Sequence, residues 1–178
     1  GPPIFFIQKR VGASYRPFNL FKFRTMEFVP TERPVIITSR DDQRITMLGR
    51  FLRKLKIDEF PQLINIIRGE INFVGPRPEV IEIVELHPKY FLFLSNSKPG
   101  LTDISSIIFK NESQVIDSNN PMKFYTSCVL PVKSKLAVLF LEKDTLFLRF
   151  VIITFTAISI FSHKMALISV SSLIPKND

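Results

Sequence analysis

The segment Gly75-Pro76-Arg77-Pro78 can form neither an α-helix nor a central β-strand, because two prolines bracket its arginine. Proline interrupts the chain again at Pro88, in the turn Lys98-Pro99-Gly100, and at the break Ser118-Asn119-Asn120-Pro121. Up to Pro121, the chain must be assembled from short elements. We therefore expect an α+β fold, mostly helical, with short strands and amphipathic interfacial helices around one core.

The pattern of apolar residues predicts three short strands. Residues 4–7 are apolar and indicate a short strand or an apolar anchor, residues 18–26 alternate apolar with polar side chains, and a short strand is expected over residues 71–74. A turn is expected from Val11 to Pro17. Residues 30–40 contain two prolines and are expected to form a loop.

Helical spacing predicts the remaining elements. Apolar residues with basic neighbours indicate a basic amphipathic helix over residues 45–55. A second helix is expected to begin at Asp58, a favourable N-cap residue, and to end near Gly69. Further helices are predicted over residues 79–86, 122–129 and 136–161.

Phe150 to Phe161 is an uncharged run of 12 residues in the C-terminal region. A membrane-spanning helix needs about 20 apolar residues. An extension to Ile174 brings in His163 and Lys164, which are costly at the centre of a bilayer. An interfacial or core helix is therefore favoured over a span.

Composition narrows the classes of protein. A net charge of +8 together with 46% hydrophobic residues excludes a disordered polycationic tail. A single cysteine, Cys128, excludes an internal disulfide framework and a cysteine zinc cluster, and His87 and His163 are too few for a histidine metal site. Nucleic acid, phosphorylated small molecules and an anionic membrane surface remain as partners. Residues 1–60 carry a net charge of +6 and are expected to face the anion.

The adjacent carboxylates of Asp58 and Glu59 are the first candidate site. Two neighbouring carboxylates raise each other's pKa, and a helix N-terminus and Arg53 nearby offset that repulsion. An ionised carboxylate held there can act as a nucleophile or bind a divalent cation. The simpler interpretation, a helix N-cap followed by a first-turn glutamate, is the more common one for this motif alone.

Arg77 is the second candidate, held between Pro76 and Pro78 on a stiff, extended segment. A guanidinium with so little conformational freedom is suited to binding phosphate oxygens in a fixed fork. A rigid surface turn with a solvated arginine is the alternative. For Lys22 and Arg24, the alternative to anion binding is charge that protects an edge strand.

These motifs stand in a fixed order along the chain, together with several flanking ones. They are Gly1-Pro2, Gln8-Lys9-Arg10-Val11-Gly12, Lys22-Phe23-Arg24-Thr25-Met26, Asp42 to Arg53, Asp58-Glu59-Phe60-Pro61-Gln62-Leu63, Asn65, Gly69, Val74 to Pro78 and Lys98-Pro99-Gly100-Leu101-Thr102. In this order they closely resemble the bacterial sugar transferase family. These are the monotopic polyprenyl-phosphate phosphoglycosyl transferases that initiate capsule, O-antigen and glycoprotein glycan assembly, and the resemblance covers residues 1 to about 160.

The resemblance implies an enzyme that transfers a phosphosugar from a UDP-sugar to a membrane polyprenol (undecaprenyl) phosphate and releases UMP, in a ping-pong reaction. By motif match, Asp58 is the nucleophile on the sugar-bearing phosphate. Glu59 is its dyad partner, which binds Mg2+ or positions the acceptor, so the expected metal ligands are Glu59 and Asp58. The remaining expected site residues are the phosphate-binding Arg53 and Arg77, the bracketing Pro76 and Pro78, and Lys22, Arg24 and Gln62, which shape the site.

The resemblance also places the protein on the cytoplasmic face of the bacterial inner membrane, attached to the inner leaflet as a monotopic protein. Family members carry a hydrophobic re-entrant helix ahead of the Gly-Pro motif, and its absence before Gly1 leads us to expect a truncated anchor. Where many members have Gly, an aromatic residue and Gln, this chain has Asp103 to Ile107, so the identity of the sugar does not carry over. The catalytic domain is expected over residues 1–161, followed by a C-terminal tail over residues 162–178.

Two other classes of protein remain open at this point. A truncated, catalytically silent membrane-surface or assembly protein would account for a missing anchor, although the intact Asp58–Glu59 pair counts against it. A basic nucleic-acid-binding domain would need exposed aromatic residues and cations on one face, whereas the Phe residues here stand mostly at core spacings. We therefore expect no nucleic-acid partner, and the sequence sets no oligomeric state.

Overall fold

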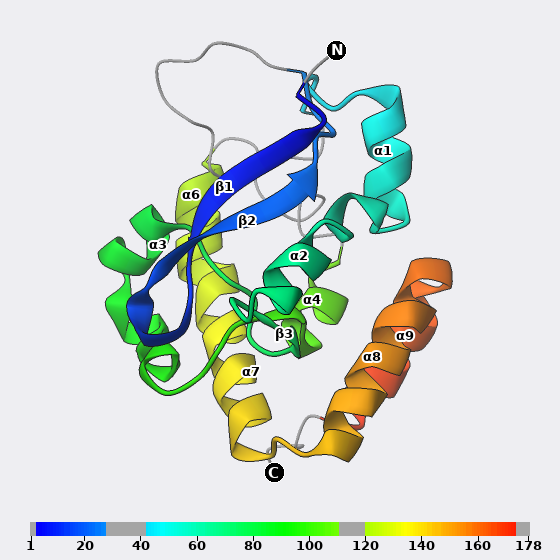
Figure 1. Ribbon diagram of the computed structural model, residues 1–178. Helices are drawn as coiled ribbons and strands as arrows, with labels where there is room; N and C mark the ends of the chain where they lie inside the picture. Colours follow the sequence, from blue (N-terminus) through cyan, green and yellow to red (C-terminus); the bar gives the residue numbers. More distant parts are fainter. Residues whose placement is uncertain (1–2, 28–41, 111–119, 174–178) are drawn as a thin grey trace.

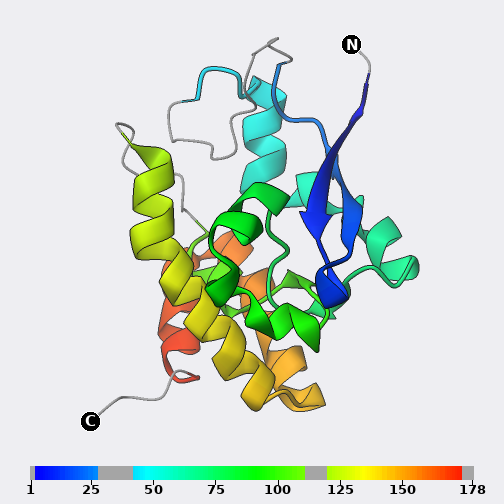
Figure 2. The ribbon, with the colours of Figure 1, turned by 90° about the vertical axis from the view of Figure 1, so that its left-hand side faces the viewer.

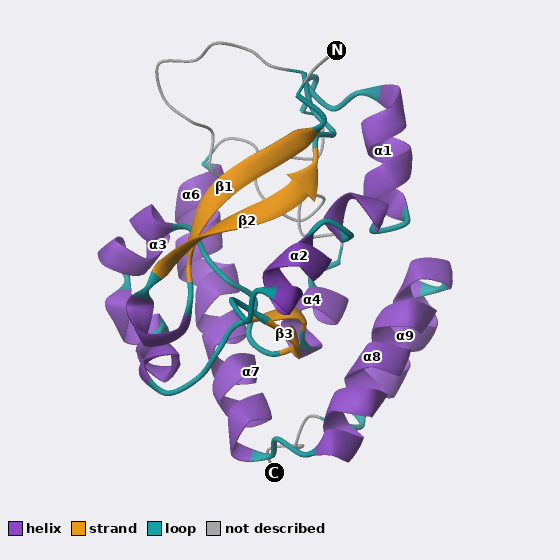
Figure 3. Ribbon diagram, in the orientation of Figure 1, coloured by secondary structure: helices purple, strands orange, loops and turns teal. Residues whose placement is uncertain are grey.

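Helices make up most of the fold, and two small sheets of two strands each complete it (Figures 1 and 3). The computed structural model describes residues 3–27, 42–110 and 120–173. The α+β class expected from the sequence is thereby confirmed. The loop expected over residues 30–40 lies outside the described residues, as does most of the break before Pro121.

A β-hairpin begins the chain. Strands β1 (Phe5–Val11) and β2 (Pro17–Phe23) pair antiparallel, from Phe5 opposite Phe23 to Val11 opposite Pro17. Between them lies the short turn η1 (Ala13–Tyr15). The turn stands where the sequence predicts it, but β1 is longer than residues 4–7. The register explains this, because every residue of β1 up to Val11 has a partner on β2.

The chain then forms α1 (Met47–Lys54), the 3-10 turn η2 (Ile57–Glu59) and α2 (Gln62–Ile67). Thr46 caps α1 by accepting a hydrogen bond from the Gly49 N–H, which confirms the predicted amphipathic helix. The predicted start of the second helix at Asp58 is wrong. Lys56 takes a left-handed conformation (φ 60°) that reverses the chain, so Asp58 enters a separate turn and caps no helix.

Strands β3 (Asn72–Val74) and β4 (Gly100–Thr102) form a short parallel sheet. A turn was expected at Lys98-Pro99-Gly100, but Gly100 belongs to the strand. A Cβ atom on Gly100 would lie 2.2 Å from the Gly75 nitrogen, so only glycine allows the two backbones to approach this closely. The sheet therefore fixes Gly75, where the proline-bracketed segment begins.

Three short helical pieces connect β3 to β4, and a fourth follows β4. They are α3 (Ile81–Leu86), which ends before Pro88 as predicted, η3 (Pro88–Tyr90), η4 (Leu92–Ser95) and α4 (Ile104–Ile108). Asp103 begins α4 with a capping box: its Oδ1 accepts from the Ser106 N–H at 2.7 Å, and its own N–H donates to Ser106 Oγ at 3.0 Å.

The next three pieces form one unbroken rod, which runs across the front of Figure 2. They are α6 (Pro121–Phe124), the π-helical turn η5 (Tyr125–Val129) and α7 (Leu130–Glu142). The sequence predicts an interruption before residue 136 and continuity to 161, and both expectations are wrong. The π turn widens the helix just before Pro131, which lacks an N–H and would otherwise clash with the preceding turn.

The real interruption lies after Glu142. Thr145 caps α8 (Leu146–Phe161) by accepting from the Leu148 N–H, and Ser162 in turn caps α9 (His163–Ser171). These last two helices pack against each other (Figure 1). Among the described residues, one helix, Pro121–Glu142, is long and apolar enough to cross a membrane by length and composition, and 33% of its most apolar window is buried. Helices in the cores of soluble proteins meet the same criterion.

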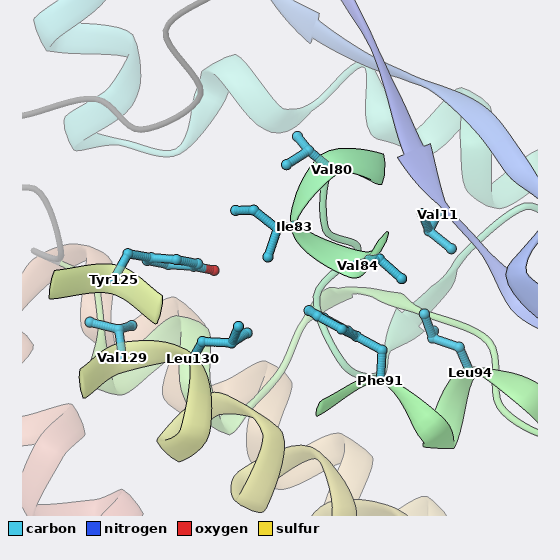
Figure 4. Packing of buried hydrophobic residues seen from close by; sticks show 9 residues of the cluster. All are labelled: Val11, Val80, Ile83, Val84, Phe91, Leu94, Tyr125, Val129 and Leu130. Atoms are coloured by element: carbon cyan, nitrogen blue, oxygen red, sulfur yellow. The ribbon is translucent and has the colours of Figure 1, made fainter. Parts of the chain in front are cut away.

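The buried hydrophobic residues form two clusters. The first gathers Val11 from the hairpin with residues around α3, η4 and η5 (Figure 4). The second joins Val74 to α4, α7, α8 and α9, and it includes Ala166 and Val170 from the segment expected to be a tail. Phe109 packs against both clusters, so they form a continuous core.

Candidate active site

The Asp58–Glu59 pair lies in η2, between the end of α1 and the start of α2. Asp58 is only 8% exposed, and its Oδ1 atom has no hydrogen-bond partner among the described residues. A buried carboxylate oxygen without a partner is costly unless another group binds it. The N-cap interpretation of this motif therefore fails, because this carboxylate oxygen accepts no hydrogen bond from the start of a helix.

Glu59 is bound by two cations from distant parts of the chain. The Arg77 guanidinium binds it in a bidentate pair, Nη1 to Oε2 at 3.1 Å and Nη2 to Oε1. Lys22 on β2 places Nζ 3.5 Å from the same Oε1. The structure thus brings together Lys22, Glu59 and Arg77, three predicted site residues that stand far apart in the sequence.

The two neighbouring carboxylates have opposite pKa shifts. Burial, followed by the charge of Glu59, raises the pKa of Asp58. Burial acts on Glu59 in the same direction, but the charges of Arg77, Lys56 and Lys22 outweigh it and hold its pKa well below the ordinary value. Asp58 is therefore the more basic carboxylate of the pair, and Glu59 stays ionised.

Lys22 has an unusually low pKa of about 8. Burial is the main cause, and the nearby positive charge of Arg77 adds to it, while Glu59 opposes both. An ammonium that loses its proton near pH 8 is uncommon among surface lysines. Such shifts are more frequent in functional sites than elsewhere.

The proline-bracketed segment is held by its own carbonyl groups. Pro76 O accepts from the Gly100 N–H at 2.9 Å, and Pro78 O accepts from Arg10 Nη1 at 3.3 Å. Between them, Arg77 donates from Nη1 to Leu101 O at 3.0 Å as well as to Glu59. The arginine side chain is 27% exposed, and its guanidinium is held by Glu59 and by Leu101 O. It is therefore not a solvated side chain on a turn.

The other predicted site residues are placed less directly. Arg53 donates from Nε to Thr25 Oγ1 at 2.8 Å, and its charge acts on Asp58. Gln62 is 1% exposed, and its Nε2 atom is a second buried polar atom without a partner in the described part of the chain. Arg24 follows β2 directly and is half-buried, and its backbone N–H donates to Ile4 O.

Two residues that support the site were given no role in it by the sequence. Lys56 supplies a charge that lowers the pKa of both carboxylates, and its left-handed backbone turns the chain into the dyad. Asn65, fully buried, ties α2 to β2: its Oδ1 accepts from the Phe21 N–H at 3.1 Å, and its Nδ2 donates to Asn19 O at 2.7 Å. The sequence signal for Lys56 was its place in the basic run before Asp58. The signal for Asn65 was its place among the family motifs.

Within residues 3–27, 42–110 and 120–173, no three His, Cys, Asp or Glu side chains gather in a group that could hold a metal ion. Mg2+ needs fewer protein ligands, because it commonly takes one or two carboxylates together with substrate phosphates. The unpartnered Oδ1 of Asp58 fits that requirement, whereas both Glu59 oxygens already bind Arg77.

The arrangement combines one basic, partly unsatisfied carboxylate with a cluster of cations. Lys22, Arg53, Lys56 and Arg77 all act electrostatically on the dyad. Cations fixed around a nucleophilic oxygen are what transfer of a phosphate-containing group requires. The site can therefore bind a phosphorylated substrate and present a carboxylate oxygen to it.

Comparison with known proteins gives a consistent result. The family model described as "Bacterial sugar transferase" matches residues 1–163. The chain is 39% identical over 111 residues to the "Uncharacterized sugar transferase EpsL" of Bacillus subtilis, which covers 62% of this chain and 54% of that protein. It is 41% identical over 127 residues to the "Exopolysaccharide production protein ExoY" of Sinorhizobium fredii, covering 63% of this chain and 56% of that protein.

A third relative is longer. The "UDP-glucose:undecaprenyl-phosphate glucose-1-phosphate transferase" of Escherichia coli is 33% identical over 108 residues, which cover 59% of this chain and 23% of that protein. The matched region thus spans about half the length of the two shorter relatives and about a quarter of the longer one.

Proposed function

The chain belongs to the bacterial sugar transferase family, and from this premise we propose that it transfers a phosphosugar from a UDP-sugar to a membrane polyprenol phosphate. UMP is the other product. The observation that carries the proposal is the Asp58 carboxylate, buried, more basic than usual and with one oxygen unpartnered, inside a ring of cations. The sugar donors and polyprenol acceptors in the names of several relatives agree with this chemistry.

In the first half-reaction, an oxygen of Asp58 attacks the phosphorus that carries the sugar. A bond forms between that oxygen and phosphorus, the bond to the bridging oxygen breaks, and the bridging oxygen leaves with UMP. Lys22 and Arg53 oppose the negative charge that develops on the phosphate oxygens. The raised pKa of Asp58 makes its oxygen a better nucleophile than an ordinary aspartate.

In the second half-reaction, an oxygen of the polyprenol phosphate attacks the same phosphorus. The acyl-phosphate bond breaks, Asp58 recovers its carboxylate, and a polyprenol diphosphate sugar is formed. Two displacements on one aspartate mean that the two large substrates need not occupy the site together. Glu59 remains ionised throughout and keeps Arg77 in place.

Mg2+ is proposed as the cofactor, held by Asp58 and Glu59 together with the diphosphate of the donor. When bound, Mg2+ neutralises phosphate charge and so makes the leaving group easier to expel. Glu59 can contribute an oxygen only by sharing it with Arg77, so Asp58 is the better ligand before the reaction begins.

A lipid acceptor places the site at the membrane surface, and the apolar exposure of the protein supports that location. The residues concerned lie on α1, between η2 and α2, on α2, and on α8; these helices follow one another from top to bottom in Figure 1. They include Met47 (90% exposed), Phe60 (60%), Ile67 (86%) and Phe147 (77%). Exposed apolar surface of this extent marks a binding or membrane surface.

Phe60 directly follows the dyad, so a membrane in contact with Phe60 brings lipid phosphates next to Asp58. We propose the inner leaflet, on its cytoplasmic side.

The experiment is a transfer assay in detergent with a panel of radiolabelled UDP-sugars, Mg2+ and undecaprenyl phosphate. We expect UMP release, a lipid-linked sugar, and a labelled protein adduct when the acceptor is omitted. Asp58→Asn should abolish all three, whereas Glu82→Gln, which makes the same change from carboxylate to amide at an exposed position on α3, should not. Activity that survives Asp58→Asn would exclude the covalent mechanism. A failure with every UDP-sugar would favour a silent membrane-surface protein.

A further inference from the structure

A pocket of about 270 Å3 lies between the end of α2, strand β3 and helix α8. Its wall is amphipathic: Lys98 and Arg149 supply positive charge, Asn72 supplies an amide, and Ile66, Phe73 and Ile153 supply apolar surface. None of Lys22, Asp58, Glu59 or Arg77 lines it. The pocket is therefore separate from the dyad site.

Lys98 is the cation of this pocket that lacks a partner. It is half-buried, and its Nζ lies 3.9 Å from where a Cβ atom on Gly69 would stand, at the end of α2. No hydrogen bond or ion pair of its ammonium occurs within the described residues. Arg149 differs, because it binds Asp144 through Nε at 2.7 Å and Nη2 at 2.6 Å. An anion entering the pocket would thus meet an uncompensated charge at Lys98.

The surroundings of the pocket point to a lipid. Phe73 is 54% exposed and Ile153 44%, and Ile67, next to Ile66 of the pocket wall, is 86% exposed. Three residues before Ile153 on α8, Phe150 is also 68% exposed. A free anion would gain nothing from this apolar rim, whereas the glycerol and first acyl carbons of a lipid would cover it.

We propose that this pocket binds the phosphate of an anionic bilayer phospholipid, with Lys98 as the principal cation and Phe73 and Ile153 against the start of its acyl chains. The lipid is not the acceptor, because an acceptor phosphate must reach Asp58 and neither dyad carboxylate lines the pocket. The site depends on the membrane location proposed above but not on the transfer reaction.

The occupied pocket would support the active site through the backbone. Lys98 lies two residues before Gly100, whose N–H binds Pro76 O, the carbonyl next to Arg77. A lipid phosphate that holds Lys98 would therefore hold the same short sheet that positions the proline-bracketed segment. The enzyme would be most ordered when it sits on an anionic leaflet.

The test uses the fact that the chain contains no tryptophan. Phe73→Trp places a single indole in the wall of the pocket, where its fluorescence reports occupancy. Dihexanoyl phosphatidylglycerol, a short-chain anionic phospholipid, should change the emission saturably. On this background Lys98→Ala should weaken binding by about tenfold or more, the loss expected for a charge-assisted contact. Lys98→Arg should restore it, and Lys89→Ala, which removes an exposed lysine on η3, should leave it unchanged.

Four results would overturn the proposal. Equal losses in the Lys98 and Lys89 variants would indicate general electrostatic attraction only. Equal affinity for inorganic phosphate would indicate an anion site without lipid recognition, and displacement of the lipid by UDP would indicate part of the donor site. A lower melting temperature of Lys98→Ala with unaltered lipid binding would mean that the lysine only stabilises the end of α2. None of these readouts needs transferase activity, so failure of the proposed function would be seen separately.

Discussion

The guanidinium of Arg77 binds the carboxylate of Glu59 through both of its terminal nitrogens, although 18 residues separate them in the chain. This pair joins the proline-bracketed segment to the turn that carries Asp58. It also means that the fork of Arg77 is occupied before any substrate arrives. A phosphate that binds Arg77 must share it with Glu59 or replace it.

We expect Arg77→Lys to lose most of the activity that Arg77→Ala loses. A lysine keeps the charge but cannot form two parallel bonds, and loss of one fixed donor commonly costs about a hundredfold or more in kcat. The measurement is kcat/KM for UMP release. Arg16→Ala, at an exposed turn position, is the matched control. If Arg77→Lys has full activity, charge alone matters and the bidentate geometry does not.

The low pKa of Lys22 predicts a decline of activity above pH 8. Deprotonation removes a charge that opposes the developing negative charge on phosphate. Lys22→Arg should remove this decline, because arginine stays protonated. The stability of the protein should not fall in parallel. Between pH 8 and the ordinary lysine pKa of 10.5, the unfolded state binds more protons, so this group's contribution to stability rises with pH. A Lys22→Arg variant with the same decline would show that another group titrates.

Removal of Mg2+ should abolish transfer. The donor diphosphate carries charge that Lys22, Arg53 and Arg77 oppose only in part, since Arg77 is already paired with Glu59. EDTA should stop UMP release, and added Mg2+ should restore it. Full activity in EDTA would show that the protein's own cations suffice.

Asn65→Ala should destabilise the protein by about 3 kcal/mol, since it leaves the Phe21 N–H and the Asn19 C=O without partners at a fully buried site. Urea denaturation in detergent measures the change in the free energy of unfolding. Asn96→Ala, at an exposed position, provides the control. Equal midpoints for the two variants would contradict the role of Asn65 in tying α2 to β2.

Gly100→Ala should reduce stability and activity by more than the addition of one methyl group suggests. Its new methyl group would lie 2.2 Å from the Gly75 nitrogen and 2.7 Å from Gly75 Cα, and neither backbone atom can move aside easily. The expected cost is about 3 kcal/mol, with a loss of activity because Pro76 and Arg77 shift together. Gly12→Ala, whose nearest contact would be 3.1 Å, should be milder in both assays. The reverse order would show that the two strands separate at little cost.

Local patterns predicted the helix of residues 45–55, the hairpin turn and the end of α3, because each depends on neighbouring residues. These patterns failed where tertiary packing determines the backbone conformation and the ends of the helices. Asp58 followed by Glu59 made an N-cap plausible, yet the left-handed Lys56 separates the dyad from α2. Periodicity also joined residues 136–161, although Thr145 and Ser162 each begin a new helix.

The candidate site shows the same division. Asp58, Glu59 and Arg77 could be named from motifs, and the rigidity of Arg77 follows from its prolines. The pairing of Glu59 with Arg77 and Lys22 could not be predicted, because it depends on how the hairpin, η2 and the short sheet pack together. The opposite pKa shifts of the two carboxylates follow from that packing and were equally inaccessible.

The π turn of η5 and Pro131 have a consequence for how this helix can vary among relatives. The Leu130 N–H binds Tyr125 O across the widened turn, which accommodates one residue more than an α-helix would. Deleting one residue from 125–129 would return the helix to regular geometry but leave Pro131 where a proline costs about 3 kcal/mol. Replacing Pro131 alone would remove the reason for the extra residue. The extra residue of the π turn and Pro131 should therefore be gained or lost together among relatives.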